Sequence, residues 1–310
     1  YTDALREAAS RGVVGVVDYE FEPGFLTWPA RYEAVGVPLR VRTSTYPVDL
    51  ERALAVGLHT GDPLVTVDGE PMVTMGSLKV ITDGSLNTRT ALCVDAYPCG
   101  GHGVANVGPQ ELCGLLAEAH GHGLTAAVHA IGDAAATHAL DAFAATGASG
   151  TLEHAQLLPG GAAARLAALG LVASVQPAHL LDDRGVTERV WGEERASRSF
   201  ALRELSDAGV VLALGSDAPV APLDPWLAMA AAAHRGEPEE VPWYPEHSLC
   251  PAAALASSTD GRGEVAVGSP ADLALLDADP LEDGGAAAAA RALRDMVVAA
   301  TWVAGREVHR

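Results

Sequence analysis

The chain has 310 residues, enough for one large α/β domain, and its 49% of hydrophobic residues argues against disorder. The formal net charge is −20, and the sequence has no Lys- or Arg-rich run. This argues against binding to nucleic acid or to an anionic membrane surface, because both are bound through clustered Lys and Arg. No uncharged stretch reaches the roughly 18 residues that a membrane span requires. The polar N-terminus does not resemble a signal peptide, so we expect a cytoplasmic protein that acts on a small molecule.

Short apolar, β-branched runs alternate with helical segments along the chain. The predicted strands occupy residues 12–20, 38–46, 76–84, 124–132, 150–158, 171–179 and 210–218. The predicted helices occupy residues 1–12, 49–61, 108–123, 133–147, 159–170 and 197–209. Such alternation is typical of parallel βαβ units. It predicts an α/β fold, a (β/α)8 TIM-type barrel of which seven strands are visible in this chain.

The sequence changes character after about residue 262. Residues 263–280 and 296–309 are typical of short strands with turns, and the Ala-rich stretch between them is compatible with a loop or a helix. We therefore expect a barrel domain over residues 1–262 and a small β-sandwich segment over residues 263–310. Because the chain opens on a helix that leads directly into the first strand, we expect the eighth barrel strand to lie before Tyr1.

Four polar residues stand near the C-terminal ends of predicted strands, namely Lys79, His129, His154 and Asp217. In a parallel barrel these strand ends converge on one face. Two imidazoles and a carboxylate suit zinc or a similar divalent ion. A lysine carbamylated by carbon dioxide would add an anionic ligand, and an aspartate beside an activated water can take its proton.

Each of these residues also has a structural interpretation when it is taken alone. His129 and His154 could be buried, hydrogen-bonded core residues, and Lys79 could be ion-paired. Asp217 could cap the turn that follows it. The occurrence of all four at strand ends favours a shared site. His179, at the end of another predicted strand, is a further candidate for the same pocket.

The order of these motifs resembles the metal-dependent amidohydrolase superfamily, in particular its family 3, the YtcJ-like branch. The motifs that carry the resemblance are LKVITDGSLNTRTA, VHAIGD, LEHAQ, GSDAPV and the tail VAVGSPADLALLDADPL. The resemblance implies one or two divalent metal ions, most suitably zinc, held by His129, His154 and Asp217, with Lys79 as a carbamylated ligand or bridge. It also implies hydrolysis of an amide or other C–N bond, with Asp217 as the general base.

The same resemblance implies that residues 83–89 line the loop above the metals. Asp83 and Arg89 are then substrate-binding candidates, with Arg89 suited to contact a carboxylate or a carbonyl. Together with His179 they complete the predicted substrate-binding set.

The sequence departs from the family at its start, since no HxH motif precedes Tyr1. We expect the chain to be a fragment of a longer gene product, the alternative being a shortened relative with an incomplete site. The competing function is a catalytically inactive binding or regulatory protein on a truncated barrel. A non-hydrolytic barrel such as an isomerase or a lyase is less favoured, and a homodimer is possible.

Overall fold

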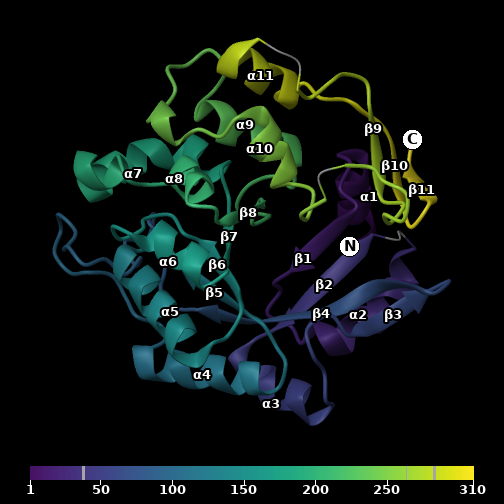
Figure 1. Ribbon diagram of the computed structural model, residues 1–310, viewed down its shortest axis with the longest axis horizontal. Helices are drawn as coiled ribbons and strands as arrows, with labels where there is room; N and C mark the ends of the chain where they lie inside the picture. Colours follow the sequence, from purple (N-terminus) through teal and green to yellow (C-terminus); the bar gives the residue numbers. More distant parts are fainter. Residues whose placement is uncertain (37–38, 263, 282–283) are drawn as a thin grey trace.

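The computed structural model describes residues 1–36, 39–262, 264–281 and 284–310 and contains one curled sheet with seven parallel strands (Figure 1). The strands, each paired in parallel with the next, are β1 (Gly15–Asp18), β2 (Arg40–Thr45), β4 (Glu70–Ile81), β5 (Ala126–Ala130), β6 (Gly150–His154), β7 (Val172–Val175) and β8 (Val211–Leu214). All seven predicted strands are thereby confirmed. Within the described residues β1 and β8 do not pair with each other, so the sheet forms an open half-barrel.

Helices cover the convex side of this sheet, as Figure 1 shows. The helices of the parallel unit are α1 (Thr2–Ser10), α2 (Gly24–Val35), α3 (Pro47–Ala55), α4 (Pro109–Gly121), α5 (Asp133–Thr146), α6 (Ala162–Ala168), α7 (His179–Ala196), α8 (Leu202–Asp207), α9 (Pro225–His234) and α10 (Pro251–Ala256), with a short 3-10 turn at Pro245–His247. The six helices that the sequence predicts correspond to α1, α3, α4, α5, α6 and α8.

Strand alternation separates the core from the site. Val128, Leu152, Ala173 and Leu212 pair side by side across β5 to β8 and belong to the core that packs against the helices. Because successive side chains of a strand point to opposite faces, the residues between them point to the concave face of the sheet. One face of the sheet is therefore apolar and packs against the helices, and the opposite, concave face carries polar side chains.

Five elements differ from the prediction. β3 (Pro63–Val67) forms an antiparallel hairpin with the first half of β4, and the helices α2, α9 and α10 were not predicted. A further helix, α7, begins at the last residue of the predicted strand 171–179. As a result His179 begins a helix and does not end a strand, which corrects its predicted placement.

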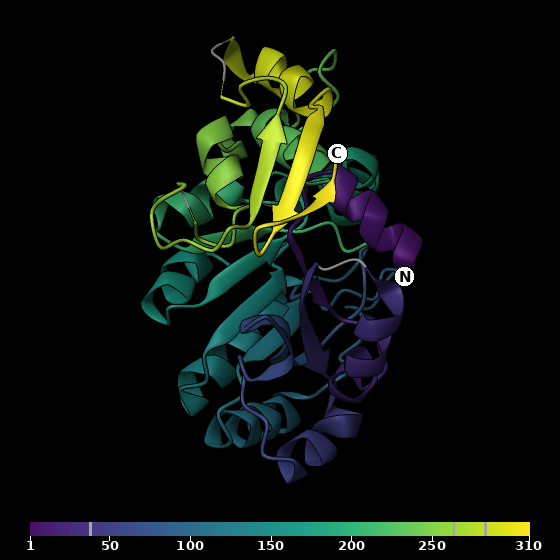
Figure 2. The ribbon, with the colours of Figure 1, turned by 90° about the vertical axis from the view of Figure 1, so that its right-hand side faces the viewer.

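The C-terminal segment forms a three-stranded antiparallel sheet of β9 (Leu273–Leu276), β10 (Val298–Val303) and β11 (Arg306–His309). The Ala-rich stretch is the helix α11 (Gly285–Arg294), which packs against α9. Helix α1 contacts β10 and β11, so both ends of the chain lie together (Figure 2). The sequence predicts a small β-sandwich over residues 263–310. Among the described residues, this segment forms one β-sheet.

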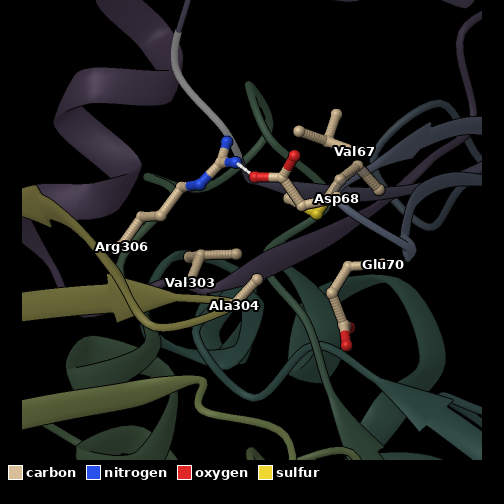
Figure 3. Close-up of a pocket in the computed structure, with 7 residues that line it drawn as sticks. Val67, Asp68, Glu70, Val303, Ala304 and Arg306 are labelled. Atoms are coloured by element: carbon tan, nitrogen blue, oxygen red, sulfur yellow. Dashed lines mark hydrogen bonds and ion pairs between the residues drawn. The ribbon is translucent and has the colours of Figure 1, made fainter.

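A small cavity of about 110 Å³ lies where the β3–β4 hairpin meets this C-terminal sheet (Figure 3). Val67, Met72 and Val303 line its apolar side. The Asp68 carboxylate pairs across the cavity with the Arg306 guanidinium. The ion pair and the apolar side chains around it join the β3–β4 hairpin to the C-terminal sheet. Among the described helices, none is long and apolar enough to cross a membrane.

Candidate functional site

Lys79 lies on the concave face of the sheet. It pairs in register with Ala127 of β5, which pairs with Thr151 of β6. One step further along the strands, His129 pairs with Glu153. Since paired residues of neighbouring strands share a face, Lys79, His129 and Glu153 all point into the half-barrel. The strand pattern alone thus brings a lysine, a histidine and a glutamate to one surface.

The amine of Lys79 is held in an unusual environment. The residue is only 5% exposed, and its Nζ lies 4.2 Å from the centre of the Tyr19 ring. Burial lowers the pKa of the Lys79 amine, while the negative charges of Glu153 and Asp217 act in the opposite direction. A buried amine that readily loses its proton can act as a nucleophile, for instance towards carbon dioxide.

His154 joins His129 through a break in strand alternation. It pairs with Ala130, whose side chain faces the helices, so a regular strand would turn His154 away from the site. Instead His154 has a φ of 69°, and its ring lies 4.5 Å from the His129 ring, centre to centre. Burial holds the pKa of the His154 imidazole well below its usual range, with the neighbouring His129 and Lys79 adding to the effect. The imidazole is therefore neutral and keeps a lone pair for a ligand.

Asp83 is fully buried and holds the turn after His129. Its carboxylate accepts hydrogen bonds from the backbone N–H groups of Ile131, Gly132 and Leu92, at 3.1, 2.9 and 2.8 Å. Its Oδ1 also lies 3.4 Å from Nε2 of His129. Asp83 therefore orients a candidate metal ligand and pins the loop of residues 84–107 to the end of β5. Its predicted contact with substrate stays a prediction.

The glycine in the VHAIGD motif permits this close approach. A Cβ on Gly132 would lie 2.0 Å from the carbonyl oxygen of Leu92, a separation that no side chain tolerates. The next residue, Asp133, accepts a hydrogen bond from the backbone N–H of Val94 at 2.8 Å. The motif thus combines a ligand candidate with three successive positions that anchor the neighbouring loop.

His179 and Asp217 lie on the far side of the site. The His179 ring stacks at 6.3 Å from the His154 ring, and its Nε2 lies 3.3 Å from the carbonyl oxygen of Ser216. Asp217 follows β8 in an exposed, left-handed backbone position with a φ of 55°. Although the residue as a whole is exposed, partial desolvation of its carboxylate raises the pKa of Asp217, opposed by the charges of His179, Lys79 and His129. The charges of His179, Lys79 and His129 thus act on the Asp217 carboxylate.

Arg89 is exposed in the loop after β4, and its backbone also takes a positive φ, of 57°. Among the described residues its guanidinium has no ion-pair partner. The predicted role in substrate binding remains a prediction.

Two residues of this face were not predicted as site residues. Tyr19 follows β1, and its hydroxyl donates a 3.0 Å hydrogen bond to Oε1 of Glu153, which is 2% exposed. Burial, and then the charge of Glu153, raises the pKa of Tyr19. The signal available in the sequence was position alone, since Tyr19 stands at a strand end and Glu153 next to His154.

The donor chemistry of the site fits a divalent ion. Neutral imidazoles and a carboxylate are ligands that zinc prefers, and the low pKa of His154 keeps it available. Within residues 1–36, 39–262, 264–281 and 284–310, however, no three His, Cys, Asp or Glu side chains converge closely enough to enclose a metal. The residue types fit an ion, and the side chains would have to draw together or gain a further ligand to enclose it.

A second hollow, of about 370 Å³, lies on the outer side of α7 and is lined among others by Arg184, Glu188, Trp243 and Tyr244. Neither this hollow nor the cavity at the hairpin includes a residue of the candidate site. The site is therefore defined by the register of its strands and the contacts of its side chains.

Comparison with known proteins identifies the family. The sequence model of the amidohydrolase family matches residues 1–309, nearly the whole chain. The chain belongs to the amidohydrolase family. The predicted resemblance to the metal-dependent amidohydrolases is thereby confirmed.

Individual relatives of this amidohydrolase agree. The chain is 33% identical, over 42% of its length, to the putative amidohydrolase YtcJ of Bacillus subtilis (strain 168). It is 32% identical, over 51% of its length, to the protein LONG AFTER FAR-RED 3 of Arabidopsis thaliana. The matched regions make up 27% and 28% of those two proteins, so the chain spans less than a third of each.

A solved structure supports the same assignment. An uncharacterized metal-dependent hydrolase from Pyrococcus horikoshii OT3 is 32% identical, with a TM-score of 0.67. The match covers 76% of this chain and 47% of that protein. The half-barrel therefore matches part of the fold of that hydrolase, over about half of its length.

Proposed function

We propose that this amidohydrolase acts as a metal-dependent hydrolase that cleaves an amide or other non-peptide C–N bond of a small molecule. The observation that carries the proposal is the gathering of Lys79, His129 and His154 on one concave face, with Asp217 electrostatically coupled to them. Membership of a family named for amide hydrolysis supports the bond type. A buried lysine, paired imidazoles and an acid of raised pKa together suit water activation better than a structural role.

The proposed roles follow the chemistry of each group. His129, His154 and Asp217 would hold one or two divalent ions, most suitably zinc, with Lys79 as a further ligand after carbamylation. An ion held there supplies Lewis acidity towards water and towards a carbonyl group. Asp217 takes the proton of the attacking water, because its raised pKa brings it closer to the working pH of a general base.

Carbamylation of Lys79 needs no oxidant and no cofactor. The neutral amine attacks the carbon of carbon dioxide, an N–C bond forms, and one C=O bond opens to an anionic oxygen while the nitrogen passes a proton to water. The buried position of the Lys79 amine supports this step, since burial favours its neutral form.

A second candidate function is a binding or regulatory protein without catalysis. The observation that favours it is that the described residues bring no three metal-ligand side chains together. Such a protein would bind the small molecule on the same concave face and leave it unchanged.

Hydrolysis of simple amides by the metal-loaded chain separates the two candidates. Zinc-loaded protein would be assayed for release of aniline from N-formyl and N-acetyl anilides, with Asp217→Asn as the test variant and Asp260→Asn as its matched control. Asp260 also has a positive φ, of 54°, and is exposed at the surface. The proposal expects turnover that only Asp217→Asn removes. Zinc binding without turnover would favour the binding protein.

Other predictions rest on the same family membership. We propose that the C-terminal sheet is part of a β-sandwich and that residues 1–262 and 263–310 form the two units of the chain. A small-molecule substrate, a homodimer and a cytoplasmic location likewise stay predictions.

A further inference from the structure

Lys79 is the only lysine in the chain, whereas the other basic residues are all arginines. That one lysine is buried on the concave face of the half-barrel. An arginine cannot lose its proton in a protein, and a lysine can. The single lysine is therefore placed where an amine, and not merely a positive charge, is useful.

The Lys79 amine is covered by an aromatic ring and lacks a direct counter-ion. Among the described residues no carboxylate lies within ion-pair distance of its Nζ, and the ring of Tyr19 is 4.2 Å away. In its charged form the amine gains from the aromatic face part of the stabilisation that water would have provided. The position of the amine thus depends on the position of the Tyr19 ring.

Tyr19 is fixed at both of its ends. Its hydroxyl donates to Oε1 of Glu153 at 3.0 Å, and its backbone carbonyl accepts a 2.7 Å hydrogen bond from the hydroxyl of Tyr46. Tyr19 follows β1 whereas Glu153 lies on β6, with β2, β4 and β5 between them in the sheet. The Tyr19–Glu153 bond therefore bridges the concave face.

Glu153 is itself held in place. It is buried, it accepts a second hydrogen bond from the hydroxyl of Thr151, and its strand neighbour is His129. A buried carboxylate requires such partners, because an unpaired charge in the interior is costly.

We propose that Tyr19 and Glu153 are positioning residues, in which the Tyr19 ring holds the amine of Lys79 in the site and the Glu153 carboxylate holds the ring. The inference deepens the proposed hydrolase function and rests on it for its purpose. The placement of Lys79 itself is testable without metal.

Because the chain has one lysine, protein grown with [13Cε]-lysine gives a single lysine side-chain NMR signal that needs no assignment. In the metal-free wild-type chain this signal should lie upfield of its free position, owing to the Tyr19 ring. The shift should vanish in Tyr19→Leu. It should persist in Glu153→Gln, which keeps the hydrogen-bond acceptor, and be lost in Glu153→Ala.

Zinc affinity, measured by competition with a chromophoric chelator, tests whether the placement serves the site. Tyr19→Phe keeps the ring and removes the bridge, and it should weaken zinc binding roughly 10- to 100-fold, the effect typical of residues that orient metal ligands. Tyr1→Phe is the matched control, since it also removes a hydrogen bond from a tyrosine hydroxyl to a glutamate, here Glu20, but at the surface. Its zinc affinity should equal that of the wild type.

A lysine signal that stays upfield in Tyr19→Leu would overturn the proposal, and so would an unchanged zinc affinity in Tyr19→Phe. Failure of the wild-type chain to bind zinc would instead overturn the proposed hydrolase function. In that case the lysine signal alone decides whether Tyr19 and Glu153 position Lys79.

Discussion

Asp83 lies 3.4 Å from His129, Oδ1 to Nε2, at the junction of the two loops that follow β4 and β5. The same carboxylate accepts three backbone hydrogen bonds from those loops and is fully buried. One side chain thus both orients a candidate ligand and fixes the shape of the surface above it. A change at Asp83 is expected to affect stability and site geometry together.

Asp83→Asn is expected to lower the free energy of unfolding by about 2 to 4 kcal/mol, because an amide offers one acceptor oxygen where the carboxylate offers two. The amide nitrogen would face either the backbone donors of Leu92 and Gly132 or the donor of Ile131. Asp133→Asn is the control, since Asp133 accepts a single loop N–H that the amide oxygen of Asn can still accept, and its loss should be below about 1 kcal/mol. Urea unfolding measures both. A change below 1 kcal/mol for Asp83→Asn would contradict the anchoring role.

Gly132→Ala is expected to destabilise the fold by roughly 1 to 3 kcal/mol, because its Cβ would overlap the backbone of Leu92. Gly114→Ala is the matched control in the middle of α4, where a Cβ meets nothing within 4 Å. That substitution should stabilise the chain by about 0.5 to 1 kcal/mol through the unfolded state and helix propensity. Equal effects at the two glycines would show that the close approach at Gly132 does not matter.

Lys79→Ala is expected to lower the zinc content of the purified chain. Added short carboxylic acids should restore part of it, because they can occupy the space of the carbamate and supply its carboxylate. Zinc content with and without acetate or propionate measures this. Full zinc content in Lys79→Ala would mean that Lys79 is structural.

Asp217→Asn is expected to raise the free energy of unfolding at neutral pH while it removes turnover. Burial raises the pKa of Asp217, so the folded state disfavours its charged form, and the penalty is present above the folded pKa. The gain over the wild type should therefore shrink as the pH falls through the folded pKa. Asn tolerates the left-handed backbone at this position. A loss of stability in Asp217→Asn at neutral pH would contradict this electrostatic interpretation.

The parallel fold was predictable because its signal is local. Each strand is a short apolar run, and several of the helices between the strands close on glycine. Helix α7 escaped prediction since its sequence is charged and carries Gly185 and Gly192. The structure accommodates this with a break at Gly192, which has a φ of 77°. Helix α2 escaped in part because it contains Pro29.

The site was predictable in its residues and less so in its contacts. Strand ends of a parallel sheet converge, which brings Lys79 and His129 together from sequence alone. The inward turn of His154 depends on a positive φ that a histidine rarely adopts, and no pattern announces it. The Tyr19–Glu153 bridge depends on the curl of the sheet, which sets the distance between strands that are not neighbours.

Zinc stoichiometry of single-histidine variants tests the central claim, that the strand-end residues hold a divalent ion. Wild-type protein, His129→Ala, His154→Ala and the exposed helix control His120→Ala would be loaded with zinc, desalted and measured by elemental analysis. We predict bound zinc in the wild type and in His120→Ala, and its loss in His129→Ala and in His154→Ala. Equal zinc in all four proteins, or none in the wild type, would contradict the account.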